Sequence, residues 1–199
     1  MPQGRWRKGG PYDPAPMLEQ RIQQQFFDSA DLKYQSAELL ARPIAEAAQA
    51  LIGAITGGAK VMCCGSGHGL VLAQHMAQLL VGRFERERPP LAALALGAQT
   101  RAQVPLQVRA LGLPGDVLLL IDDGDGGSAA AIAAARGKDM TLVVLAGRGA
   151  QALRELLSEA DVLIAVPHER AARVAEAHLL VLHCLADAID FQLMGELDT

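Results

Sequence analysis

Two glycine-rich turns carry most of the residues of this chain that could do chemistry. The first contains Gly65, Ser66, Gly67 and His68, between an apolar run and a helical pattern. Backbone N–H groups in such a turn can cradle an anion at the start of a helix; the alternative is a tight turn that uses glycine for its backbone freedom. The glycine spacing departs from the dinucleotide fingerprint, so both interpretations stay open.

The second turn is acidic. Asp122, Asp123 and Asp125 precede a helical pattern that begins at Ser128. Carboxylates at the start of a helix are favoured by its dipole, and this is the interpretation that we prefer. The same charges would repel a phosphate, whereas a divalent cation could bind them. The turn lacks the spacing and the distal glutamate of a calcium loop, so cation binding is the lesser alternative.

Three histidines on expected helices could bind a metal or move a proton. His75 follows the first turn, and His178 and His183 lie on the last helical segment. Residues five apart on a helix point about 140° from each other, so His178 and His183 are not expected to hold one ion together. His75 and His183 could converge across the end of the sheet, but two neutral imidazoles make an incomplete zinc site.

The elements that must position these groups alternate between apolar runs and helical patterns. The apolar runs, expected as parallel strands buried on both faces, are residues 60–64, 91–96, 117–121, 140–146 and 161–166. Helices are expected over residues 70–84, from Ser128, and over residues 170–193. This pattern predicts a doubly wound, Rossmann-like α/β/α domain in three layers, with a mostly parallel sheet of about five strands. Ligands of such sheets bind at the carboxyl ends of the strands, where both turns lie.

A helical extension precedes this α/β core. We expect a single domain over residues 17–194, with N-terminal helices in residues 17–57 and the core in residues 58–194. Pro43 is expected to divide the extension into two helices, which serve packing or oligomerisation. Residues 1–16 are rich in proline, glycine and arginine and are interpreted as a disordered tail or leader.

Composition bounds the class of protein. The 199 residues carry a formal net charge of −4, and 51% are apolar but only 4% aromatic. An acidic body with few aromatic side chains argues against direct nucleic-acid binding. No signal peptide or apolar run of membrane-spanning length is visible, and three cysteines, two of them adjacent, do not suggest a disulfide framework. A cytoplasmic protein without a membrane partner is expected.

Two further segments are assigned structural roles. Cys63 and Cys64 lie on an expected buried strand, where packing is the favoured role. Arg86 and Arg88 alternate with glutamates, and this pattern predicts a solvated turn rather than a nucleic-acid patch.

Several separated segments resemble one family in the same order. They are residues 83–89 (RFERERP), 91–96 (LAALAL), 107–112 (QVRALG), 114–119 (PGDVLL), 139–141 (DMT), 166–168 (VPH) and 173–187 (RVAEAHLLVLHCLAD). They resemble the sugar isomerase (SIS) family, in the branch that holds phosphoheptose isomerase and the DnaA initiator-associating protein. The resemblance covers roughly residues 17–193. It implies a homotetramer of α/β subunits with sites between subunits and, in the isomerase, conversion of sedoheptulose 7-phosphate to a heptose phosphate.

The resemblance also implies a zinc site and a phosphate loop, and this chain departs from both. The family's zinc ligands correspond to His75 and His183, but Leu79 stands at the glutamate position and Ala175 at the glutamine position. The serine- and threonine-rich phosphate loop corresponds to the acidic residues 122–128. The substrate-contacting stretch between the second strand and Gln107 is shorter than in the family. The phosphosugar site is therefore expected to be degenerate, formed by Gly65, Ser66, Gly67, Asp122, Asp123 and Ser128, with His75 and His183 as vestigial metal ligands.

These departures lead us to predict a non-catalytic scaffold that resembles the DnaA initiator-associating protein. It would act as a homotetramer, bind the replication initiator DnaA and regulate initiation, with no catalytic residue and no cofactor. Phe191, Leu193 and Met194 could supply an apolar anchor for the partner or simply cap the last helix. The alternatives are a phosphoheptose isomerase, with His183 catalytic and zinc as cofactor, and a phosphosugar-binding regulator.

Overall fold

The computed structural model describes residues 15–97, 102–124 and 126–195. Helices and strands alternate along this part of the chain, as the apolar runs predict. They are α1 (Ala15–Thr56), β1 (Val61–Gly65), α2 (His68–Val81), β2 (Ala93–Ala95), α3 (Gln103–Leu111), β3 (Val117–Ile121), α4 (Ser128–Arg136), β4 (Thr141–Ala146), α5 (Gln151–Arg154), β5 (Val162–Ala165) and α6 (Ala171–Met194).

The strands form one parallel sheet in the order β2-β1-β3-β4-β5. Val61 of β1 stands beside Val117 of β3, which in turn stands beside Thr141 of β4. Successive side chains point to opposite faces, so Cys63 joins one buried cluster and Cys64 the other. Continuous aliphatic strands are buried on both faces, which confirms the predicted doubly wound fold.

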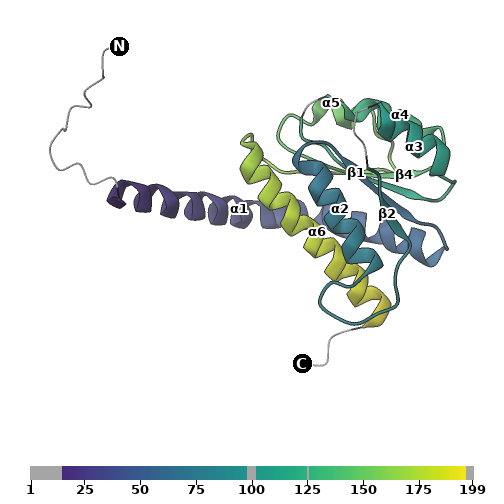
Figure 1. Ribbon diagram of the computed structural model, residues 1–199, viewed down its shortest axis with the longest axis horizontal. Helices are drawn as coiled ribbons and strands as arrows, with labels where there is room; N and C mark the ends of the chain where they lie inside the picture. The colour runs from purple at the N-terminus through teal and green to yellow at the C-terminus, as the bar shows by residue number, and fades with distance from the viewer. Residues whose placement is uncertain (1–14, 98–101, 125, 196–199) are drawn as a thin grey trace, which may run out of the picture.

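Helices cover both faces of the sheet in three layers (Figure 1). On one face α1, α2 and α6 pack against side chains such as Leu119 and Leu145. On the other face α3 and α4 pack against Leu118 and Val144. None of the helices in the described residues combines the length and the apolar character that a bilayer span requires.

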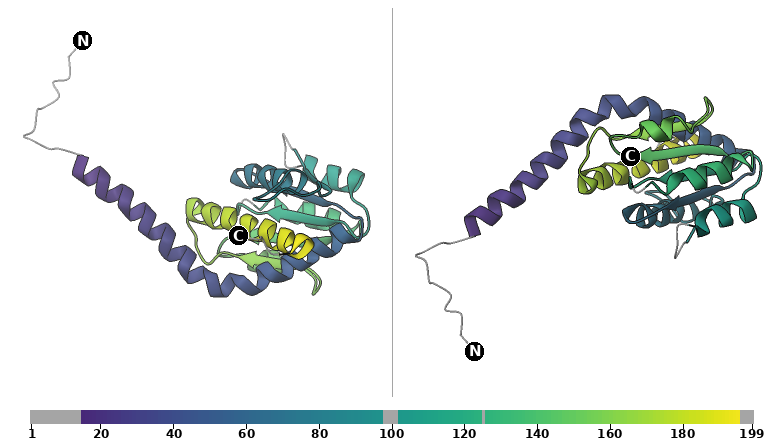
Figure 2. Two further views of the ribbon diagram at one scale, coloured as in Figure 1. Left: turned by 90° about the horizontal axis from the view of Figure 1, so that it is seen from below. Right: turned by 90° about the horizontal axis from the view of Figure 1, so that it is seen from above.

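Helix α1 differs from the prediction in two ways. It is one helix with Pro43 inside it, not two helices divided at this residue. Figure 2 shows that the helix changes direction in its middle part, as a proline that removes a backbone donor would cause. The second half continues because Ala47, Ala48 and Leu51 are buried against the rest of the domain. Its first half projects from the body (Figures 1 and 2).

The predicted disordered tail, residues 1–16, falls almost wholly outside the described residues. Only its last two residues are described, and they are helical: Ala15 and Pro16 begin α1. Proline is tolerated in the first turn of a helix, because the N–H group that it lacks has no intrahelical acceptor there. The helical extension therefore begins before the predicted boundary at residue 17.

Two short helices were not predicted, and one strand is shorter than expected. Helix α3 lies between β2 and β3, and α5 is a single turn between β4 and β5. Strand β2 covers three residues at the sheet edge rather than residues 91–96, because only these pair with β1. Helix α2 ends at Val81, before Gly82, rather than at residue 84.

The predicted solvated turn at residues 85–88 is wrong for Arg88. Its side chain is only 1% exposed and pairs with Asp190 of α6, with 2.5 Å between Nε and Oδ1. The guanidinium also donates to the carbonyl oxygens of Leu79 and Leu80 at the end of α2. Alternating charges predict exposure, but carbonyls left open at a helix end attract a buried arginine.

The adjacent cysteines have the packing role that their strand position predicts. Cys63 and Cys64 are fully buried on opposite faces of the sheet. Burial raises the pKa of Cys64 to about 12 and that of Cys63 further. A thiol that stays protonated is a poor nucleophile, so both side chains act as apolar core residues.

Candidate functional site

A cavity of about 400 Å³ opens at the carboxyl ends of the strands. The turns after β1, β3, β4 and β5 and the start of α6 line it. Polar side chains come from each turn: His68 after β1, Asp122 and Asp123 after β3, Arg148 after β4 and His168 after β5. This is the edge of a doubly wound sheet where ligands bind.

The two predicted turns meet at this cavity. A Cβ atom placed on Gly67 would lie 2.6 Å from Asp123 Oδ2, and one on Gly69 would lie 2.5 Å from the carbonyl oxygen of Ile121. Gly65 approaches the backbone of Gly69 as closely. Gly67 also has a φ of 53°, which disfavours other residues. The close approach of the turns thus accounts for these glycines and supports the tight-turn interpretation.

The acidic turn satisfies its own hydrogen-bond donors. Ser128 Oγ donates to Asp122 Oδ1 at 2.6 Å, and the N–H of Gly124 donates to Asp122 Oδ2 at 3.1 Å. Helix α4 has no acidic residue in its first turn, so Asp122 stabilises the helix start through the hydroxyl of Ser128. Asp125 lies outside the described residues. The carboxylate of Asp122 thus occupies the place in the turn where an anion would seek donors.

Sequence reasoning did not single out Arg148, His168 or Glu169 as site residues. Arg148 and His168 follow neighbouring strands, and the N–H of Arg148 donates to the carbonyl oxygen of His168 at 3.0 Å. Arg148 also faces Glu169, with 3.8 Å between Nη1 and Oε1, and both side chains are exposed. The rule that ligands bind at strand ends could have identified these residues, since each follows an apolar run.

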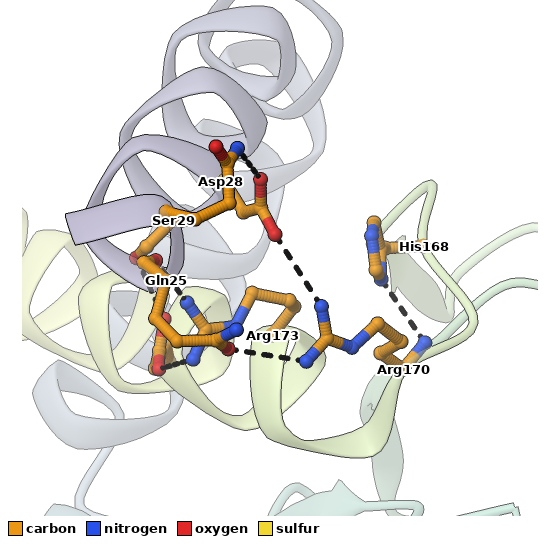
Figure 3. A network of polar contacts seen from close by, with 8 residues as sticks. Gln25, Asp28, Ser29, His168, Arg170 and Arg173 are labelled. Atoms are coloured by element: carbon orange, nitrogen blue, oxygen red, sulfur yellow. Dashed lines mark hydrogen bonds and ion pairs between the residues drawn. The ribbon is translucent and has the colours of Figure 1, made fainter. Parts of the chain in front are cut away.

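A network of polar contacts joins His168 to the projecting half of α1 (Figure 3). The N–H of Arg170 donates to His168 Nδ1 at 3.0 Å, and the Arg170 guanidinium contacts Gln25 and Asp28 of α1. Arg173 donates to the carbonyl oxygen of Gln25 at 2.6 Å. Because Nδ1 of His168 accepts a hydrogen bond, the neutral ring carries its proton on Nε2.

His178 is a buried wall of the cavity. Its side chain is held by a 3.2 Å hydrogen bond from Nε2 to the carbonyl oxygen of Ala146. Burial lowers the pKa of His178, although this hydrogen bond and the charge of Asp122 partly oppose the shift. His178 is therefore neutral at pH 7 and points away from His183, in line with their spacing on α6.

His75 and His183 come together on α2 and α6. Their Nε2 atoms are 3.1 Å apart, and Phe84 packs against the ring of His183. Burial lowers the pKa of His75, and the neighbouring His183 lowers it further. Neither ring lines the cavity, but Leu72 and Ala175, on the same two helices, do. The pair therefore lies beside the cavity on its α2 side.

The residues around this pair do not fit the zinc site that the resemblance implies. Leu79 is packed in the apolar core and Ala175 carries no donor, so only two imidazole nitrogens face each other. The described residues contain no group of three or more His, Cys, Asp or Glu side chains that could hold a metal ion. A hydrogen bond between one protonated and one bare Nε2 satisfies both rings without a metal.

The predicted apolar anchor lies at the far end of α6 from the cavity. Phe191 is 51% and Met194 47% exposed, whereas Leu193 packs against the core. The cavity lining reaches along α6 as far as His178, so Phe191 lies roughly 20 Å beyond it along the helix. The structure thus separates the anchor from the turns that line the cavity.

Comparisons with known proteins agree on one family. The SIS domain model matches residues 25–147. The phosphoheptose isomerase of Methylibium petroleiphilum is 55% identical over 92% of this chain and 98% of its own, and that of Aromatoleum aromaticum is 44% identical over 89% and 97%. The solved phosphoheptose isomerase of Neisseria gonorrhoeae is similar with a TM-score of 0.80 at 32% identity, covering 87% of this chain and 98% of that one.

These relatives overturn the prediction of a non-catalytic scaffold of the DnaA initiator-associating type. The similar proteins are phosphoheptose isomerases, and the solved relative from Francisella tularensis, with a TM-score of 0.81 at 33% identity over 86% of this chain and 97% of its own, is another. The prediction was wrong because it weighed a few site substitutions above the similarity of the whole chain. The chain belongs to the SIS family, in its phosphoheptose isomerase branch.

Proposed function

We propose that this protein is a phosphoheptose isomerase that interconverts sedoheptulose 7-phosphate and an aldose heptose phosphate. One observation carries the proposal: the similarity to phosphoheptose isomerases extends over nearly the whole of both chains. The cavity at the strand ends supports it, because about 400 Å³ is enough for one small phosphosugar. Its polar lining, with carboxylates, imidazoles and one guanidinium, suits a ligand that carries both hydroxyls and a phosphate.

Proton transfer is the chemistry that the histidine pair can supply. An aldose–ketose isomerisation moves a proton between adjacent carbons, so it needs a group that accepts a proton and returns it. Of the two Nε2 atoms of His75 and His183, one donates and the other accepts, so a donor and an acceptor stand 3.1 Å apart. We infer that substrate reaching the pair from the cavity breaks this hydrogen bond, so that the freed Nε2 of His183 accepts the substrate proton while His75, kept neutral by its lowered pKa, lies beside it.

The test is a coupled assay of the purified protein with sedoheptulose 7-phosphate, with and without added zinc. Turnover by the wild type is expected, and His183→Ala should lower kcat by about 100-fold or more. Cys184→Ala is the matched control, because this neighbouring side chain on α6 is exposed. Absence of turnover by the wild type under both conditions would contradict the proposal.

A phosphosugar-binding regulator is the second candidate. Leu79 and Ala175, at the positions of the family's other zinc ligands, favour it, because they leave fewer groups for catalysis. In this case sedoheptulose 7-phosphate would raise the melting temperature of the protein without being converted. Turnover in the coupled assay rules this candidate out.

Self-association is part of the proposal. The first half of α1 exposes Leu18 and Ile22, by 56% and 57%, where it projects from the body (Figure 2). These residues precede the buried Ser36 and Leu40 by 18 positions, which is about five helical turns, so they continue the same face. A second copy of the chain would extend the contact that this face makes with its own domain. Light scattering should show an oligomer, and Ile22→Glu should reduce its mass.

A further inference from the structure

We propose that the substrate phosphate binds to Arg148 and His168, beyond β4 and β5, and not in the turn of residues 122–128. The inference rests on the proposed function, because it takes the cavity to accept a phosphosugar. It assigns an anion-binding role to Arg148 and His168. The resemblance to the family would instead place the phosphate at residues 122–128.

The acidic turn is poorly suited to a phosphate. The hydroxyl of Ser128 and the N–H of Gly124, which could donate to a phosphate, already donate to the carboxylate of Asp122. Ser128 is only 7% exposed, so its hydroxyl has little freedom to turn to a ligand. Asp122 and Asp123 add two negative charges on the same side of the cavity. A phosphate here would have to compete with Asp122 for these two donors and would meet like charges.

Arg148 offers the opposite environment. Among the described residues it is the one arginine in the cavity lining, and its side chain is 67% exposed. Its contact with Glu169 is 3.8 Å long and exposed to solvent, so it does not hold the guanidinium in place. A guanidinium that can turn into the cavity is able to bind a phosphate through two parallel hydrogen bonds. A phosphate would have to displace Glu169, the carboxylate that Arg148 faces.

His168 lies next to Arg148, and its ring is held so that Nε2 can donate a hydrogen bond to a ligand. The hydrogen bond from the N–H of Arg148 to the carbonyl oxygen of His168 keeps the two turns together. The N–H of Arg170 occupies Nδ1 of His168, so Nε2 carries the proton of the neutral ring and donates. Figure 3 shows how Asp28 and Gln25 of α1 hold Arg170 on the side of the network away from His168.

The order of the strands explains why this orientation suits the proposed reaction. In sedoheptulose 7-phosphate the carbonyl and the phosphate are at opposite ends of the carbon chain. The sheet order places the turns after β4 and β5 at one side of the cavity and the turn after β1, which leads into α2, at the other. With its phosphate on Arg148, the substrate spans the β3 turn, where Asp122 and Asp123 accept its hydroxyl groups. Its carbonyl end then points to α2, which carries His75.

Calorimetric titration with sedoheptulose 7-phosphate and with unphosphorylated sedoheptulose tests the inference. Arg148→Ala should weaken binding of the phosphosugar by about tenfold or more and leave binding of the free sugar unchanged. Arg109→Ala is the matched control, because this exposed arginine on α3 is outside the cavity lining, and it should bind as the wild type does. Melting curves of each variant establish that it is folded.

The outcomes separate this inference from the proposed function. If the wild type binds the phosphosugar, Arg148→Ala binds it equally well and Ser128→Ala loses binding, the phosphate occupies the acidic turn and the inference is wrong. An equal loss of phosphosugar affinity in Arg148→Ala and Arg109→Ala would also contradict the inference, because the removal of any positive charge would then explain the loss. If the wild type binds neither ligand and shows no turnover, the proposed function itself fails.

Discussion

The two ends of helix α6 hold ion pairs of the same chemistry in opposite environments. At the start of the helix, Arg170 faces Asp28 at 3.4 Å, with side chains 54% and 35% exposed. Near its end, Asp190 faces Arg88 at 2.5 Å, with side chains 5% and 1% exposed. Water screens the first pair and is excluded from the second. Burial, more than the identity of the partners, therefore decides what each contact contributes to stability.

The difference matches what each end does. The start of α6 lines the cavity, where side chains have to rearrange around a ligand. The far end joins α2 to α6, because Arg88 binds both Asp190 and the last carbonyl oxygens of α2. Asp190 Oδ2 is buried without a hydrogen-bond partner among the described residues, so this carboxylate depends on Arg88 for its countercharge. We expect substitutions at the far end to affect stability and those at the near end to affect binding.

The largest effect is expected for Arg88→Met. The substitution leaves the carboxylate of Asp190 buried without its countercharge, which costs about 3–5 kcal/mol of unfolding free energy. Urea denaturation at pH 7 measures the loss. The double variant Arg88→Met/Asp190→Leu should recover much of it, because no uncompensated charge remains. A loss below about 1 kcal/mol in the single variant would mean that the pair behaves as a surface contact.

A smaller loss of unfolding free energy is expected for Arg173→Met. This arginine lies near the start of α6, but its side chain is buried. The Arg173 side chain is 9% exposed and donates to the carbonyl oxygen of Gln25, while its ion pair with Glu176 is 2.5 Å long. Removing these charged hydrogen bonds should cost about 1–3 kcal/mol in the same denaturation experiment. A loss of unfolding free energy as large as that of Arg88→Met would show that the two ends of α6 contribute equally to stability.

His178 should make stability depend on pH. Its pKa is lowered by burial, so the unfolded chain binds a proton more readily than the folded one does. Unfolding free energy should therefore be unaffected well above pH 6.5 and fall as the pH drops below about 6.5, the ordinary histidine value. His75 acts in the same direction. The contribution of His178 is the difference between the wild type and His178→Asn, which should have the flatter profile between pH 7 and 5.

The smallest effect on stability is expected for Arg170→Ala. The pair with Asp28 is exposed, so its loss should change the unfolding free energy by no more than about 1 kcal/mol. Binding of sedoheptulose 7-phosphate is the more sensitive measurement, because the Arg170 side chain holds the segment that contacts His168. A large loss of stability with unchanged binding would reverse the comparison between the two ends of α6.

The sheet could be predicted because local patterns suffice for it. Continuous aliphatic runs such as residues 117–121 satisfy a strand buried on both faces wherever they lie. The division at Pro43 failed for the opposite reason: whether a helix continues through a proline depends on burial of distant residues such as Leu51. The prediction that Arg88 is exposed to solvent failed for the same reason, since alternating charges do not reveal that Asp190 lies beside it.

The candidate site was predictable in part. The rule that ligands bind at strand ends identified the turns of residues 65–69 and 122–127. The second turn lines the cavity, but of the first only His68 and Gly69 do, so the predicted Gly65, Ser66 and Gly67 lie outside its lining. The same rule extends to Arg148 and His168, since both follow strands. The predicted function was wrong because substitutions such as Leu79 were counted as loss of activity, whereas the relatives named phosphoheptose isomerase extend over nearly the whole chain.

The amino-acid sequence by itself determined the alternation of strands and helices, the parallel sheet and the turns at its carboxyl edge, because these depend on neighbouring residues and short-range periodicity. Only the tertiary structure decided which distant groups meet. His75 and His183 are 108 positions apart, yet their Nε2 atoms are 3.1 Å apart, and Arg88 finds Asp190 across 102 positions. Such contacts depend on how α2 and α6 pack against the sheet, and no local pattern in the chain encodes that geometry.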